Sequence, residues 1–301
     1  ASVSDVSLSA TEQTLAYLSG NKLSVGNFIS DVDAGTNVLT LTAKVTSGVL
    51  SLSESFSGVS VVSGSGTNTL VLSGNQADLN RLLAAKGKGL AYLNSSDAPA
   101  LADQLTLSVN DNGAAGAGGA LTGTQSYLIS ITSVNDAPVL SLSAAATDTT
   151  GLYSSKQGQA LVAPMATLSD VDGSAYSAFS VRIEQSNTAG VITNGAKAGD
   201  ALTLTSAASQ TLASAGFQAT FANGSISFTG SGNQSITQAD LLNVLRGVTF
   251  TTTQSTFAVG ETRTISFTVT DAVGSSSLSS NSARSVLTLT ESPYALSLIH
   301  I

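Results

Sequence analysis

The chain has 301 residues, of which 42% are hydrophobic and only 10% are charged, and its formal net charge is −8. With 11 Lys and Arg residues it is poorly suited to nucleic-acid phosphates or anionic membranes, whereas cations are suitable small partners. The absence of cysteine excludes disulfides and thiolate metal sites, and no apolar run approaches the roughly 18 residues of a membrane span. Ala1 opens the chain without a signal-peptide pattern, so we expect an excerpt from a longer polypeptide.

Most of the chain predicts β-strands in which apolar and polar residues alternate. Such alternation places one face of a strand in a core and the other face in water. In chain order the clearest segments are Val38–Val45, Thr69–Leu72, Leu105–Val109, Tyr127–Ile131, Phe179–Ile183, Leu202–Leu204, Ile226–Phe228, Ile265–Val269 and Val286–Leu289. About seven such segments per half of the chain, separated by Gly, Asn and Ser turns, predict an all-β fold of antiparallel sandwiches.

Three short motifs occur twice, in the same order, and divide the chain into two modules. They are Ile29–Gly35 and Leu168–Gly173, Gln76–Leu79 and Gln238–Leu241, and Ser108–Asp111 and Thr268–Asp271. The interval between the first two motifs is about 23 residues longer in the second copy, and we place the extra residues near 186–216. Pro138 cannot donate a ladder hydrogen bond, so we predict modules at 1–137 and 138–293.

Each module also predicts one short helix. Asn75 is a suitable N-cap for Gln76 to Ala85, and Thr237 for Gln238 to Arg246, with Gly247 ending the second helix. The leucines expected to face inward are Leu79, Leu82 and Leu83 in the first helix and Leu241, Leu242 and Leu245 in the second. Helices of about ten residues are marginal alone, so each must pack against its sandwich. The Gly- and Ala-rich segment Asp111–Gly123 predicts a mobile loop.

Enzymatic functions are disfavoured by the residue types present. Residues 294–301 break the strand pattern, and we interpret them as a non-native tail. The sole histidine, His300, lies there, so a Ser-His-Asp triad or a histidine metal site would depend on that tail. Five glutamates and no tryptophan give little support to a glycosidase pair or a sugar-stacking site. We therefore predict that the chain is not an enzyme and has no catalytic residues.

The aspartates carry the strongest functional signal. In a seven-strand sandwich, the loops after the second and sixth strands open at the same pole, where the chain enters the module. This count gathers Asp31, Asp33 and Asp111 in the first module, and Asp170, Asp172 and Asp271 with the entering Asn135 and Asp136 in the second. Four carboxylates around one joint repel each other, and no neighbouring Lys or Arg offsets them.

A hard cation would relieve this repulsion. Ca²⁺ takes 6–8 oxygen ligands from carboxylates, Asn carbonyls, backbone and water, and we predict it as the bound ion. Asp97 and Asp103 precede the sixth strand of the first module, and we expect them to face the joint and complete its ligand shell. The alternative is that these Asp and Asn residues only shape turns, as they commonly do. Asp78 and Asp240, at the helix starts, are interpreted as capping partners.

The ordered motifs resemble a known family. Asp-Val-Asp, the Gln-Ala-Asp-Leu helix, Ser-Val-Asn-Asp and Asn-Asp-Ala-Pro are similar to cadherin-like modules, related to chondroitin-sulfate-proteoglycan repeats, of giant type I-secreted bacterial adhesins. The resemblance covers roughly residues 8 to 291. It implies that Asp136 acts as a linker ligand and that Asp170, Asp172 and Asp271 complete a calcium site, with Asp5 the remnant of an upstream linker. Glu291-Ser292-Pro293 replaces Asn-Asp-Ala-Pro at the second module's end.

The sequence therefore predicts a calcium-stiffened structural repeat segment of an extracellular adhesin or stalk at the cell surface. Its expected partners are neighbouring repeats of the same polypeptide, with a host glycan or surface protein as a further partner. Two alternatives remain open. One is a glycan- or protein-binding module that uses the 111–123 loop or the 186–216 insertion, and the other is an accessory domain of a larger secreted enzyme.

Overall fold

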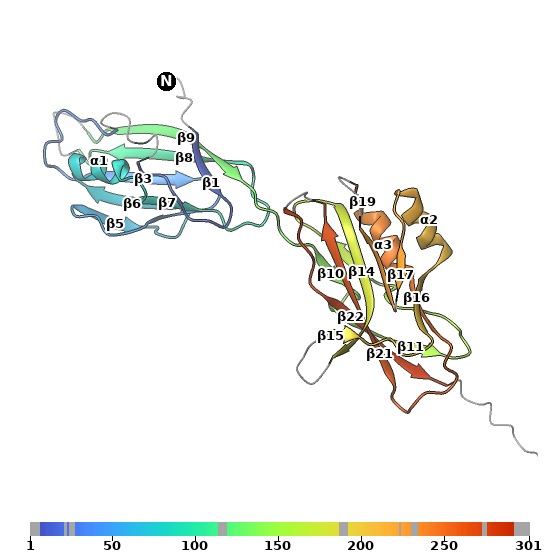
Figure 1. Ribbon diagram of the computed structural model, residues 1–301. Helices are drawn as coiled ribbons and strands as arrows, with labels where there is room; N and C mark the ends of the chain where they lie inside the picture. The colour runs from blue at the N-terminus through green and yellow to red at the C-terminus, as the bar shows by residue number, and fades with distance from the viewer. Residues whose placement is uncertain are drawn as a thin grey trace, which may run out of the picture. The chain divides into compact units, whose positions relative to one another are not determined.

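The computed structural model describes residues 7–20, 23, 28–113, 119–186, 192–222, 224–229, 234–272 and 276–291 (Figure 1). The chain divides into two compact units, Ala1–Val134 and Asn135–Ile301. The boundary lies three residues before the predicted one, so Asn135 and Asp136 belong to unit 2. The predicted tail at 294–301 and the predicted linker remnant Asp5 lie outside the described residues.

Unit 1 is a sandwich of two sheets. Its elements are β1 (Ser7–Thr11), β2 (Ala16–Tyr17), β3 (Leu39–Val45), β4 (Val49–Leu52), β5 (Val59–Ser63), β6 (Thr69–Gly74), α1 (Gln76–Ala84), β7 (Leu90–Leu93), β8 (Ala102–Asn110) and β9 (Thr122–Thr132). One sheet has the order β1-β9-β8-β3-β6-β5 and the other β2-β7-β4. The alternation seen in the sequence of β3 places Leu39, Leu41, Ala43 and Val45 in the core between them.

Unit 2 repeats this plan with additions. Its elements are β10 (Val139–Ser141), β11 (Thr149–Ser154), β12 (Ala160–Leu161), β13 (Thr167–Ser169), β14 (Ala175–Ser186), β15 (Ile192–Asn194), β16 (Asp200–Leu204), α2 (Ser206–Ser214), β17 (Thr220–Ala222), β18 (Ser225–Thr229), β19 (Ile236–Thr237), α3 (Gln238–Arg246), β20 (Val248–Thr252), β21 (Thr262–Asp271) and β22 (Ala283–Thr290). The large sheet runs β11-β22-β21-β14-β18-β17, with β15 and β19 also on β14, and faces β12-β20-β16; β10 and β13 form a separate pair.

The two units share the strand order of an immunoglobulin-like sandwich. We letter seven strands A to G in chain order, as β1, β2, β3, β4, β7, β8 and β9 in unit 1 and as β11, β12, β14, β16, β20, β21 and β22 in unit 2, and leave the other strands without letters. B, E and D then form one sheet, β2-β7-β4 or β12-β20-β16, and C, F and G lie together in the other, as β3-β8-β9 or β14-β21-β22. The predicted all-β class of tandem cadherin- or Ig-like sandwiches is confirmed. The expectation of purely antiparallel sheets is wrong at one edge of each unit, because β1 lies parallel to β9 and β11 parallel to β22. Alternation specifies a strand but not the direction of its neighbour.

The two predicted helices are confirmed, together with their caps. The Asn75 side chain accepts from the backbone N–H of Asp78, and that of Thr237 accepts from the N–H of Asp240. Asp78 and Asp240 themselves accept hydrogen bonds from the capping side chains. One inward residue was wrongly predicted: Val244 is buried in α3, whereas Leu242 is only partly buried.

A third helix, α2, was missed, so one helix per module is wrong for unit 2. The predicted insertion near 186–216 contains β15, β16 and α2. Of these, β16 is the counterpart of β4 in unit 1, since both pair with the E strand, so the additions are β15 and α2. Helix α2 packs against α3 so closely that a Cβ atom at Gly247 would lie 2.4 Å from the Cβ of Ala208 (Figure 1). Within the predicted 111–123 loop, β9 already begins at Thr122, and residues 114–118 lie outside the described part.

Replacing Leu245 by Ala should lower the free energy of unfolding of unit 2 by about 2–5 kcal/mol, because its side chain is fully buried between α3 and the sheets. Leu242→Ala is the matched control, on the same helix but only partly buried, and should cost less than half as much. Urea unfolding followed by circular dichroism measures both. Equal losses for the two variants would contradict the placement of the helix.

Candidate functional site

The Asp-Val-Asp motif forms the same turn in both units. In unit 2, Asp170 Oδ1 accepts the backbone N–H of Asp172 at 3.1 Å. In unit 1, Asp31 Oδ1 accepts those of Asp33 and Ala34 at 3.0 and 3.1 Å. The first aspartate therefore shapes the backbone, as the turn alternative expected. This use leaves the second aspartate of each pair, Asp33 or Asp172, exposed to solvent.

The aspartate after the sixth strand closes the loop to the last strand. Asp271, which is 1% exposed, accepts the N–H of Leu278 through Oδ1 at 3.0 Å and donates its own N–H to the Leu278 carbonyl at 3.1 Å. Asp111 does the same with Leu121, at 2.8 and 3.2 Å, and also accepts the N–H of Gly113 at 2.9 Å. These backbone donors lower the pKa of Asp111.

The segment that opens unit 2 is bonded to these aspartates. The Asn135 amide Nδ2 donates to Asp271 Oδ2 at 2.7 Å and to the Ser276 carbonyl at 3.0 Å. The backbone N–H of Asp136 donates to Asp172 Oδ2 at 2.5 Å. Unit 2 thus brings Asn135 to Asp271 and Asp136 to Asp172.

The electrostatics of this group show carboxylates crowded in a partly desolvated place. Burial raises the pKa of Asp170, and the charges of Asp271 and Asp172 raise it further. The phenol of Tyr176, buried beside them, has its pKa raised to about 12 by burial and by the charges of Asp170 and Asp271. Among the described residues, no Lys or Arg forms an ion pair with Asp170, Asp172 or Asp271.

The oxygen atoms of this group suit a hard cation, but the contacts that the structure shows between these residues are hydrogen bonds. The Asn135 Oδ1 atom is buried without a hydrogen-bond partner in the part of the chain that the structure describes, while Nδ2 of the same amide donates to Asp271 Oδ2. Carbonyl and carboxylate oxygens are the ligands that Ca²⁺ takes. Within the same residues, no group of three acidic side chains is already placed to hold a metal ion. An ion would have to draw these oxygens together.

The other predicted site residues are placed differently. In unit 1 no described hydrogen bond joins Asp31 or Asp33 to Asp111; the Asp31 N–H instead binds Gln76 Oε1 at 2.8 Å. Asp103 is 4% exposed, and its two oxygens already accept hydrogen bonds from the protein. The donors are the N–H groups of Thr46, Ser47 and Gln104 and the hydroxyls of Ser47 and Tyr92. Asp97 is on the surface and accepts from the Gln13 amide at 2.6 Å.

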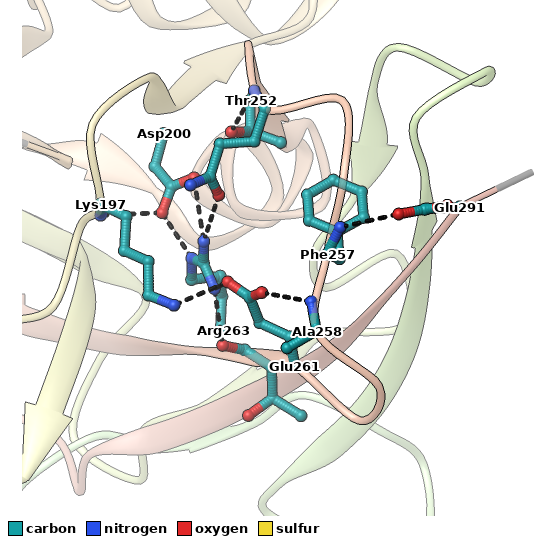
Figure 2. A network of polar contacts seen from close by, with 10 residues as sticks. Lys197, Asp200, Thr252, Phe257, Ala258, Glu261, Arg263 and Glu291 are labelled. Carbon is teal, nitrogen blue, oxygen red and sulfur yellow. Dashed lines mark hydrogen bonds and ion pairs between the residues drawn. The ribbon is translucent and has the colours of Figure 1, made fainter.

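Sequence reasoning missed a buried ionic network in unit 2, shown in Figure 2. Arg263 occupies the position of β21 that Asp103 occupies in β8, next to the first residue of the strand. Its guanidinium pairs with Asp200 and Glu261, and Glu261 also pairs with Lys197. A signal was present: Arg263 leads the inward series Ile265, Phe267 and Val269, where a charged residue needs buried partners.

No family model and no curated protein matches the chain. Similar solved structures include human mucin-like protocadherin EC1-2, with 12% identity, a TM-score of 0.33 and coverage of 97% of this chain and 98% of that one. The Streptococcus agalactiae AgI/II polypeptide BspA C-terminal domain has 8% identity, a TM-score of 0.25 and coverages of 93% and 95%. Protocadherin gammaB7 EC3-6 has 14% identity and a TM-score of 0.30 over 82% of this chain, which spans only 42% of that structure. At these values the likeness carries no information about ligands or activity, and the fold assignment rests on strand order. No helix among the described residues is long and apolar enough to cross a membrane.

Glu261 should titrate near pH 2, since hydrogen bonds from Lys197, Ala258 and Arg263 lower its pKa from 4.5 to about 2. Because the pKa of Glu261 is lower in the folded state, its ionised form stabilises the fold at pH values above the unfolded-state pKa of 4.5. This contribution is lost as the pH falls from 4.5 through 2. Carboxyl NMR measures the titration. Lys197→Met should raise the pKa of Glu261, whereas Lys88→Met, which removes a surface partner of Glu54, should leave it unchanged. A Glu261 titration near pH 4.5 in the unaltered protein would contradict the network.

Proposed function

We propose that this chain is a structural segment of an extracellular, cell-surface protein, built from tandem cadherin-like repeats and stiffened by Ca²⁺ at the start of unit 2. The observation that carries the proposal is the attachment of Asn135 and Asp136 to Asp271 and Asp172, beside Asp170. This chain's partners are then the neighbouring repeats of its own polypeptide. Its proposed work is mechanical, and we assign a catalytic role to none of its residues.

The proposed ligands are oxygens of Asn135, Asp136, Asp170, Asp172 and Asp271. Two carboxylates ~5 Å apart repel by about 1–3 kcal/mol at effective dielectric constants of 20–80, and a divalent cation turns that repulsion into attraction. The Asn135 Oδ1 atom, which has no hydrogen-bond partner among the described residues, adds a neutral oxygen of the kind that Ca²⁺ accepts. Ca²⁺ is favoured over Mg²⁺ because the ligands come from separate loops, which do not supply a rigid octahedron.

The ends of the two units explain why binding here would stiffen the chain. The Val134 N–H donates to Glu12 Oε1 of unit 1 at 2.9 Å, and the next residue, Asn135, is bonded to unit 2. Few backbone dihedrals therefore remain to connect the units. An ion that held Asn135 and Asp136 to unit 2 would limit rotation about those bonds.

The strand order supports a load-bearing role. In unit 1 the first strand, β1, lies parallel to the last, β9, and in unit 2 β11, which follows the short strand β10, lies parallel to the last strand, β22. A pull on the two ends of a unit then acts along both strands in opposite directions. It loads the hydrogen bonds of the whole pair together, instead of opening them one at a time from one end.

By the same reasoning, Asp31, Asp33 and Asp111 form a second calcium site when a preceding segment supplies the ligands that Asn135 and Asp136 supply to unit 2. We leave Asp103 out of the proposed ligand set. Among the described residues, each of its two oxygens accepts three hydrogen bonds, from Thr46, Ser47, Tyr92 and Gln104. Each oxygen of Asp271 accepts one, from Leu278 or from Asn135, and so stays more open to a metal.

Asp172→Asn should weaken calcium binding at least ~10-fold, because a site of this kind gains affinity from each ligand charge. Tyr176, close to the proposed site, makes Tb³⁺ luminescence a direct readout, and calorimetry with Ca²⁺ gives the affinity. Asp97→Asn is the control, since it removes one surface charge in unit 1. Equal affinity for the two variants, or no binding at millimolar Ca²⁺, would overturn the proposal.

Calcium should also narrow the range of arrangements of the two units. Small-angle scattering of the whole chain is expected to give a longer maximum dimension with Ca²⁺ than with a chelator. Asp172→Asn should show the chelated profile under both conditions, while its circular dichroism spectrum stays unchanged. Superimposable profiles for the unaltered protein with and without Ca²⁺ would rule out stiffening even if the ion binds.

A further inference from the structure

The far end of unit 2 holds a second group of carboxylates, and it is arranged differently. Asp271 ends β21, whereas Arg263 lies near the beginning of the same strand. At about 3.3 Å per residue the two positions are about 26 Å apart. The Arg263 network, which consists of Lys197, Asp200, Gln254, Glu261 and Arg263, therefore stands at the end where β22 finishes (Figure 2).

The guanidinium in this network has its hydrogen bonds satisfied while it is only 2% exposed. Nε donates to Asp200 Oδ2 at 2.5 Å, and Nη1 donates to Glu261 Oε1 at 2.8 Å and to the Thr262 carbonyl at 3.0 Å. Nη2 donates to Gln254 Oε1 at 2.9 Å. The planar fork of Arg suits this, since it reaches several oxygens at fixed angles.

The charges within the network balance. Lys197 Nζ lies 2.7 Å from Glu261 Oε1, so two cations face the carboxylates of Asp200 and Glu261. Backbone N–H groups complete the set, from Lys197 to Asp200 Oδ2 at 2.9 Å and from Ala258 to Glu261 Oε2 at 3.0 Å. At the other end of unit 2, Asp170, Asp172 and Asp271 have no such cations among the described residues.

The network also holds the last strand. The Leu289 N–H of β22 donates to the Glu261 carbonyl at 2.8 Å, and Glu291 Oε1 accepts the N–H of Phe257 at 3.1 Å. The Phe257 ring packs edge-on against Tyr153 of β11, the strand parallel to β22, with ring centres 6.1 Å apart. The end of β22 is thus tied both to β11 and to the loop that the network fixes (Figure 2).

We infer that Lys197 and Arg263 permanently neutralise the carboxylates at this end of unit 2, as a bound cation is proposed to do at the other end. The attachment of β22 to the rest of the unit is then independent of calcium. Unit 1 differs, because Asp103 stands where unit 2 has Arg263 and forms no ion pair among the described residues. The two ends of unit 2 therefore respond differently to a chelator. The expected difference between the two ends in their response to a chelator rests on the proposed function. The attachment of β22 by the Arg263 network does not.

Hydrogen exchange of the whole chain, read by mass spectrometry with Ca²⁺ and with a chelator, tests this. Peptides covering 254–261 and 284–291 should exchange equally under both conditions, and Arg263→Met should speed their exchange at least ~10-fold in both. Glu261→Gln, which keeps the Arg263–Asp200 pair, should give a smaller acceleration in the same peptides and serves if Arg263→Met does not fold. Lys88→Met, which removes an exposed partner of Glu54 in unit 1, is the control and should leave these peptides unchanged.

Faster exchange at 254–261 and 284–291 on chelation would overturn calcium independence, and unchanged exchange in both Arg263→Met and Glu261→Gln would overturn the role of the network. If chelation changes no peptide anywhere, including 135–143, the calcium proposal fails while the hold on β22 is still judged from the two variants.

Discussion

A carboxylate that leaves water must receive hydrogen-bond donors or a cation, and both units are organised around this requirement. Burying an ionised carboxylate without partners costs far more than one hydrogen bond returns. Asp103, Asp271, Asp200 and Glu261 all lie at strand ends, where loops fold back and exclude solvent. How each is compensated decides which loops are held, and therefore what each end of a sandwich can do.

Three kinds of compensation occur in one chain. Backbone N–H groups serve Asp111 and Asp271, whose oxygens close the loop between the last two strands. Uncharged side chains and N–H groups surround Asp103, and the buried Arg263 serves Asp200 and Glu261. The group around Asp170 has no Lys or Arg ion pair among the described residues, and burial, followed by the charges of Asp271 and Asp172, raises the pKa of Asp170. That contrast, more than the number of aspartates, is why a cation is proposed there.

The shared strand order explains why the repeated motifs recur at the same places. The Asp-Val-Asp turn lies between the B and C strands, and Asp111 or Asp271 lies at the end of the F strand. Both therefore belong to one end of each sandwich. Of the additions in unit 2, β15 pairs with the far end of β14, at Glu184 to Ser186, and α2 packs against α3. The fold has therefore gained elements without losing the turns that these aspartates form.

The sequence alone determined the local features. Period-two alternation predicted the strands, Asn75 and Thr237 marked the helix starts, and the repeated Asp motifs marked the turns, because these depend on neighbours within a few residues. Tertiary structure decided the parallel pairing of β11 with β22, the burial of Val244 in place of Leu242, and the partners of Asp103 and Arg263. Those depend on residues tens of positions away that pack only after the sheets form. The residues next to an aspartate or glutamate in the sequence do not reveal whether an N–H group, a guanidinium or an ion will face its carboxylate.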